Sequence, residues 1–169
     1  MAAFNQQIPG TDEFEIADEF FASMLADSEE AGVLLEDVSC DGPGFYHEIL
    51  EFDDGLLSDF LKEHNVSENV FFTGVFAYNL SRFAGSDNVL FNIVENGRDR
   101  FDNYDSIGMF VNTLPIIADC SNRAVGDFMD YMSDTVYDVM ANSFYPFRIL
   151  AKDYDVTADI IFQFVPGWI

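Results

Sequence analysis

The stretch that decides the fold is residues 96–116, which read NGRDRFDNYDSIGMFVNTLPI. Its first part is polar and contains Gly97, and the apolar run 107–111 follows before Asn112 and Thr113 interrupt it. A polar turn with glycine, followed by β-branched and aromatic residues, predicts a loop that enters a buried strand. Because burying an unpaired amide or hydroxyl costs a few kcal/mol, Asn112 and Thr113 need hydrogen-bond partners.

Outside this stretch, hydrophobic periodicity predicts helices and strands along the whole chain. Helices are expected at 11–26, 53–65, 68–83 and 122–141, with a short one ending near 153; further strands are expected at 45–52, 88–94 and 158–169. The helix at 68–83 is apolar almost all round, which predicts burial in the core. This order of elements indicates an α/β domain with helices packed on a mixed sheet.

Composition sets the class of protein. The chain has 169 residues, of which 49% are hydrophobic and 19 are Phe, so we expect one folded domain with a large core. Seven basic and 31 acidic residues give a net charge of −24, which disfavours nucleic acids and anionic membrane surfaces as partners. Without an apolar run of about 18 residues or a basic N-terminal signal region, a soluble, cytoplasmic protein is expected.

Neither histidine is placed for an obvious reaction. His47 lies on an expected strand and His64 at the end of an expected helix, and no serine, cysteine or acid pair stands beside either one. Both are therefore expected to be structural or partly exposed. The sequence also contains no Walker A loop and no GxGxxG, so the usual phosphate-binding loops are not expected.

Metal binding is not expected from the sequence. Cys40 and Cys120 are far apart and lack a CxxC spacing, which favours two reduced thiols over a disulfide or a zinc site. Asp99, Asp102 and Asp105 recur every three residues, a spacing that differs from the Asp-x-Asp-x-Asp-Gly calcium loop.

The deciding stretch resembles the C-terminal half of the condensation domains of nonribosomal peptide synthetases. That family has a Gly-Arg pair, a spacer, and then Ile-Gly-x-Phe-Val-Asn-Thr-Leu-Pro-Leu-Arg. This chain has Gly97-Arg98 and then IGMFVNTLPI at 107–116, with Ile117 in place of the family's Arg. The segments at 81–89 and 145–147 resemble the family's Ser-Arg…Gly-x-Asp and Tyr-Pro-Phe segments, and the whole resemblance covers roughly 20–164.

The resemblance implies a fold and a reaction. It implies that residues 1–169 are a single fragment, most of the C-terminal subdomain of a chloramphenicol acetyltransferase-like fold with two α/β subdomains. In such domains two substrates, each carried on the phosphopantetheine of a carrier domain, meet in a tunnel and are joined by an amide bond. Carrier domains and the N-terminal subdomain are thus the expected partners, and no directly bound cofactor is expected.

The resemblance also implies that this chain alone is inactive. The family's catalytic His-His-x-x-x-Asp-Gly sequence is absent: the Asp-Gly pairs at 41–42 and 54–55 lack the preceding histidines. No catalytic residue is therefore assigned here. An isolated subdomain would also expose an apolar cleft face, on which two copies could dimerise.

The same resemblance suggests roles for a few residues. Asn112 and Thr113 are expected to support the substrate tunnel, although Asn112 could instead satisfy loop backbone and Thr113 could pair with backbone. Arg98 is expected either at the subdomain junction, paired with the absent Asp of the histidine sequence, or in a pair with one of the three local aspartates. Gly97 and Gly108 are expected to allow unusual backbone conformations or a close approach.

Two other functions remain open from the sequence. A non-catalytic module of the same fold would bind carrier domains without forming a bond. An epimerisation domain shares the fold and the histidine sequence, but the Phe-Val-Asn-Thr form favours condensation. An unrelated α/β domain is the remaining alternative.

Overall fold

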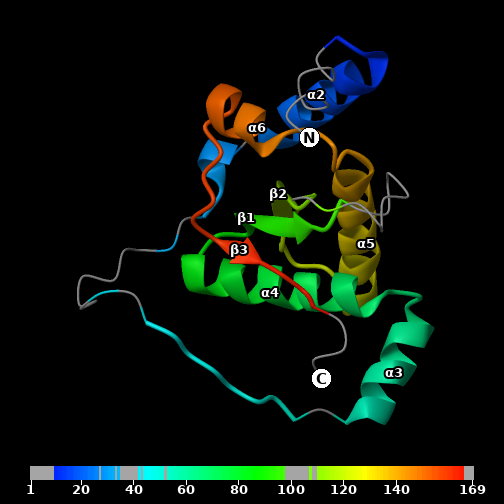
Figure 1. Ribbon diagram of the computed structural model, residues 1–169. Coiled ribbons are helices and arrows are strands. Elements are labelled where there is room, and N and C mark those ends of the chain that lie inside the picture. The colour runs from blue at the N-terminus through cyan, green and yellow to red at the C-terminus, as the bar shows by residue number, and fades with distance from the viewer. Residues whose placement is uncertain are drawn as a thin grey trace.

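The structure is a computed structural model, and it describes residues 10–26, 28–32, 34, 42, 44–51, 53–97, 107 and 110–165 (Figure 1). The elements are α2 (Asp12–Leu25), the 3-10 helix η1 (Ser28–Glu30), α3 (Asp54–Glu63), α4 (Glu68–Ala84), β1 (Asn88–Glu95), β2 (Asn112–Asp119), α5 (Val125–Ala141), α6 (Phe147–Asp153) and β3 (Ile161–Phe162). The predicted helices are all present, with ends within a few residues of the expected positions.

The three strands form one mixed sheet in the order β2-β1-β3. β1 and β2 are antiparallel, with a register that runs from Asn88 opposite Asp119 to Glu95 opposite Asn112. β3 is parallel to β1 and pairs Ile161 with Asn92. The prediction of helices packed on a mixed sheet is confirmed.

Alternate residues of the two long strands form the centre of the core. Phe91 of β1 pairs with Ile116 of β2, and both side chains are almost fully buried. Phe76 of α4 packs edge-on against Phe91, with ring centroids 5.2 Å apart, so this face of the sheet is covered by α4. Figure 1 shows α4 on one side of the sheet, α5 beside it, and α2 with α6 towards the other side. Each such buried side chain contributes about 1.5–3 kcal/mol.

Three helices begin at side chains that cap their first turn. Asp53 caps α3 by accepting from the N–H groups of Gly55 and Leu56, and one hydroxyl caps each of α2 and α4. The Phe14 N–H donates to Thr11 Oγ1 at 3.2 Å at the start of α2, and the Val70 N–H donates to Ser67 Oγ at 3.2 Å at the start of α4. Each hydroxyl cap satisfies one N–H that has no partner within the helix, and is worth about 1 kcal/mol. Ser67 is thus the N-cap of α4.

The expectation that α4 is buried all round is wrong. Val70, Ala77 and Leu80 are buried, but Tyr78 is 50% exposed and Phe83 is 83% exposed. The reason is geometric: α4 contacts β1 and α5, which cover only part of its circumference. Phe83 therefore stays exposed, and Tyr78 is only partly covered, by Phe128 of α5 with ring centroids 6.5 Å apart.

Three predicted strands also differ from the structure. The described part of 45–52 forms no strand and pairs with none of the described strands. The strand expected from the apolar run 107–111 begins only at Asn112; Ile107 is fully exposed and Val111 is 49% exposed. β2 starts where its register with β1 starts, so pairing rather than apolarity fixes its end. The strand expected at 158–169 is reduced to β3 within the described residues.

The two histidines are placed differently in the structure. His64 is the C-cap of α3, and its ring lies 4.4 Å from that of Phe60; His47 is exposed. None of the helices in the described part of the chain combines the length and apolarity needed to cross a membrane.

Candidate functional site

Asn112 opens β2 and joins it to the connection between α5 and α6. Its Nδ2 donates one hydrogen bond to the carbonyl oxygen of Ser143 and one to that of Tyr145, each 2.8 Å long. A side-chain amide has two N–H donors, so both are used by backbone. The partners that the sequence demanded for this amide therefore exist, and they lie 31 and 33 residues away in the chain.

Gly97 brings the two ends of the 96–111 connection into backbone contact. Its φ of +67° lies in the left-handed region, and a Cβ built on it would lie only 2.2 Å from the carbonyl oxygen of Phe110. Its N–H donates to Glu95 Oε1 at 3.2 Å. Any other residue would be strained at this φ and would also collide with backbone, so the position requires glycine.

Of the remaining residues that the resemblance suggests, the structure describes only Thr113. Thr113 is half-buried and lies opposite Val94 in the sheet. Arg98 and Gly108 lie outside the described residues, as do Cys40 and the three aspartates spaced every third residue. Their expected roles stay predictions.

Sequence reasoning missed a carboxylate that holds α2 to this same region. The hydroxyl of the fully buried Tyr145 donates to Asp18 Oδ1, and the Tyr154 hydroxyl donates to the same oxygen at 2.8 Å. Burial and the neighbouring Asp18 raise the pKa of both tyrosines, that of Tyr154 to about 12. The available signal was Asp18 itself, an acid next to the apolar stripe of a helix.

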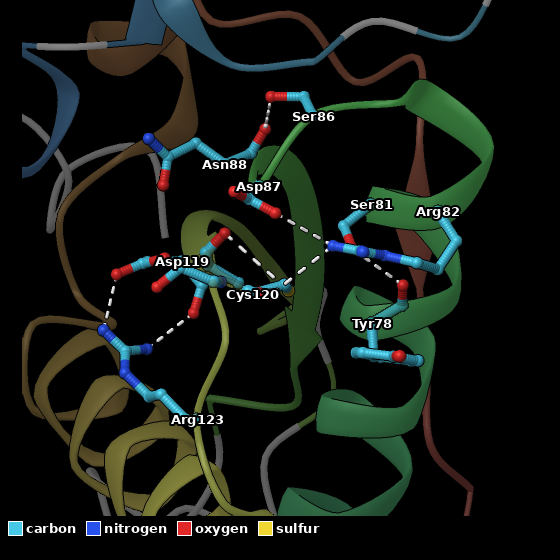
Figure 2. Close-up of polar contacts among 11 residues, drawn as sticks. Tyr78, Ser81, Arg82, Ser86, Asp87, Asn88, Asp119, Cys120 and Arg123 are labelled. Carbon is cyan, nitrogen blue, oxygen red and sulfur yellow. Dashed lines mark hydrogen bonds and ion pairs between the residues drawn. The ribbon is translucent and has the colours of Figure 1, made fainter.

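A second polar cluster lies at the other end of the sheet, around Arg82 (Figure 2). The guanidinium donates to Asp87 Oδ1 at 3.0 Å and to Ser81 Oγ at 3.1 Å, and lies 5.2 Å from the centre of the Tyr78 ring. It also reaches the carbonyl oxygen of Cys120, 3.5 Å away. The Ser-Arg…Gly-x-Asp segment thus fastens the end of α4 to the end of β2.

Arg123 makes a matching set of contacts after β2. It pairs with the Asp119 carboxylate, donates to the Asp119 carbonyl oxygen at 2.6 Å, and lies 4.2 Å from the centre of the Tyr131 ring. Burial raises the pKa of Asp119, but hydrogen bonds from Ser121 and the charge of Arg123 outweigh it and hold the pKa below its usual range. Burial raises the pKa of the Cys120 thiol, which favours an unreactive thiol.

A pocket of about 750 Å³ lies beside this second cluster. Its lining includes Leu57 and Phe60 of α3, Tyr78 and Arg82 of α4, and Phe128 of α5. β2 spans eight residues, roughly 24 Å, between Asn112 and this end of the sheet. The pocket and Asn112 are therefore separate features. In the part of the chain that the structure describes, no three His, Cys, Asp or Glu side chains are grouped to hold a metal ion.

The family follows from a match over nearly the whole chain. Residues 5–165 match the family model for the condensation domain. This chain belongs to the condensation-domain family. It is 30% identical over 82 residues to surfactin synthase subunit 1 of Bacillus subtilis (strain 168), a match that covers 48% of this chain and 2% of that protein. It is 32% identical over 87 residues to gramicidin S synthase 2 of Brevibacillus brevis, covering 50% of this chain and 2% of that protein.

Solved structures share the fold at low sequence identity. The cyclization-docking bidomain of a nonribosomal peptide synthetase from Sorangium cellulosum aligns with 96% of this chain and 36% of its own, with a TM-score of 0.75 and 10% identity. The first condensation domain of the calcium-dependent antibiotic synthetase, in complex with a substrate analogue, aligns with 95% of this chain and 37% of its own (TM-score 0.66, 16% identity). The expected chloramphenicol acetyltransferase-like fold is confirmed, and this condensation-family chain spans little more than a third of those structures.

Proposed function

We propose that this chain supplies the C-terminal subdomain part of a nonribosomal peptide synthetase condensation domain and supports amide-bond formation there. The observation that carries the proposal is the family match over residues 5–165, which contains the Phe-Val-Asn-Thr sequence at the start of β2. The donors would be aminoacyl or peptidyl thioesters on the phosphopantetheine of carrier domains. The acceptor would be the amine of an aminoacyl group on a second carrier.

The reaction requires a base near the attacking amine and donors around the tetrahedral centre. The His-His-x-x-x-Asp-Gly sequence that serves this purpose in the family is not among these 169 residues. The proposed base must therefore come from an N-terminal subdomain across the tunnel, and the chain alone is expected to be inactive.

Within this chain, Asn112 is proposed to act as a positioning residue. Because both of its N–H donors are bound to the carbonyls of Ser143 and Tyr145, the amide fixes the tunnel wall instead of donating to substrate. Gly97 supports the same wall by closing the backbone against Phe110. This role agrees with the expectation that Asn112 supports the tunnel, and its hydrogen bonds to backbone carbonyls are how it would do so.

Turnover with two loaded carrier domains tests the proposal. The 169-residue chain is compared with the full polypeptide translated from its reading frame, and amide formation is followed by the intact mass of the acceptor carrier. The proposal predicts product with the full polypeptide and none with the chain alone. Product formed by the chain alone would contradict the need for a base from outside it.

The second candidate is a non-catalytic carrier-binding module of the same fold. Among the solved structures of similar fold is a complex of the X-domain and OxyB from teicoplanin biosynthesis, with a TM-score of 0.67 and 15% identity. Titration of a carrier domain against the full polypeptide separates the two functions. Carrier binding without any turnover supports the module, whereas turnover excludes it.

A further inference from the structure

The segment at residues 44–51 belongs to no helix or strand, and no strand of the described part of the chain pairs with it. Figure 1 shows it running clear of the helices and the sheet before it enters α3. No backbone group of these residues hydrogen-bonds to any described part of the chain. The Tyr46 hydroxyl donates to Glu48 Oε2 at 2.6 Å, which places side chains two residues apart on one side, as in an extended strand.

Large apolar side chains lie on both faces of this segment. Phe45 is 92% exposed and Ile49 75% on one face, while Tyr46 is 83% exposed and Leu50 66% on the other. A strand that carries apolar side chains on both faces belongs in a sheet covered on both sides. The eight residues would span about 26 Å, an ordinary strand length.

We infer that residues 44–51 are a strand of a β-sheet that belongs to the part of a condensation domain absent from this chain. This inference rests on the proposed function, because it needs an N-terminal subdomain beside the chain. The similar solved structures leave room for such a sheet, since this chain aligns with only 36–37% of two of them. Strand addition satisfies the free N–H and C=O groups and buries both apolar faces at once.

A second copy of the chain is a poorer occupant. With a net charge of −24 the copies repel each other, and a pair of these segments alone would leave both apolar faces uncovered. The sheet of this chain is also a poor occupant on the β1 side, where β3 and an isolated bridge from Gly32 to Val89 already take the edge.

Hydrogen exchange tests the inference. Backbone amide exchange of residues 45–51 is measured in the 169-residue chain and in the full polypeptide of its reading frame. These amides are expected to exchange about tenfold more slowly, or slower still, in the full polypeptide than in the 169-residue chain. In the chain alone they are expected to be unprotected.

Proline substitutions add a second readout. Consecutive N–H groups of a strand point to opposite edges, so His47→Pro and Glu48→Pro each remove one donor from a different edge. At least one of them is expected to destabilise the full polypeptide, while neither changes the stability of the isolated chain. His47→Ala and Glu48→Ala are the matched controls, since they keep the backbone donor.

Each outcome bears on the inference separately from the proposed function. Protection of these amides without turnover supports the proposed strand and contradicts the proposed function. Turnover without protection supports the proposed function and contradicts the proposed strand. Protection in the isolated chain, together with a dimer in sedimentation, would show that a second copy is the occupant and overturn the inference. A reading frame that encodes no N-terminal subdomain would overturn it too.

Discussion

At the scale of single residues, two positions around the deciding stretch explain why its sequence is so restricted. Asn112 uses its amide to bind two carbonyls from a distant turn. Gly97 lets the chain pass within contact of Phe110. Both residues therefore act through backbone geometry, and their worth can be measured as stability as well as activity.

Asn112→Asp is expected to lower the free energy of unfolding by about 2–4 kcal/mol. The change removes both donors and sets a carboxylate against two carbonyl oxygens, which leaves buried polar groups unpaired. Asn79→Asp is the control, because the Asn79 amide is exposed and donates only to Val75 of its own helix at 2.8 Å. Equal losses for the two variants in urea denaturation would show that the Asn112 contacts carry no special weight.

Gly97→Ala and Gly85→Ala separate backbone conformation from collision. Both glycines have nearly the same φ, +67° and +65°, but a Cβ on Gly85 would meet nothing within 4 Å. Gly85→Ala should cost about 1 kcal/mol from its conformation alone. Gly97→Ala should cost clearly more, and similar thermal unfolding midpoints for the two variants would argue against a close approach to Phe110.

At the scale of elements, α2 is held to the residues on both sides of α6 by two hydroxyls that share one carboxylate. Tyr145 and Tyr154 both donate to Asp18, and Phe14 stacks on Tyr145 with ring centroids 4.9 Å apart. α2 is thereby joined to the turn that Asn112 also binds. A change at either end of this network should be felt at the other.

Alkaline pH is expected to weaken this contact. The folded pKa of Tyr154 is about 12, above the value of about 10 in an unfolded chain, so the protonated hydroxyl stabilises the fold below pH 10. That stability is lost as the pH rises from 10 through 12. Denaturant titrations over this range should show that the free energy of unfolding depends less steeply on pH for Tyr154→Phe than for the wild type. Tyr137→Phe is the control for losing a hydroxyl. Identical pH dependence in Tyr154→Phe and the wild type would refute the coupling between Tyr154 and Asp18.

The sequence predicted the elements well where hydrophobic periodicity is strong, as in α2 and α4. It failed where contact with neighbours decides: Phe83 is exposed because nothing described covers that side of α4, and β2 begins at Asn112 because its register with β1 begins there. The need for partners at Asn112 was predictable from burial costs, but their identity was not. Ser143 and Tyr145 come close only through the packing of α5 and the turn after it.

At the scale of the whole molecule, the described fold is well packed around β1 and β2 and open along the segment at 44–51. Its motif residues divide into two groups at opposite ends of β2: Asn112 and Gly97 at one end, the Arg82 and Arg123 clusters at the other. Only the first group lies at the proposed tunnel wall, and the second holds α4 and the loop after β2 in place. The proposed catalytic base lies in neither group.

Amide-bond formation by this chain is proposed to need a histidine from outside its 169 residues. Single-turnover transfer between two carrier domains, read as the intact mass of the acceptor carrier, tests it most directly in the full polypeptide. Alanine in place of the second histidine of His-His-x-x-x-Asp-Gly is expected to abolish the mass increase, while Asn79→Asp is expected to preserve it. An undiminished mass increase in the histidine variant would contradict the claim.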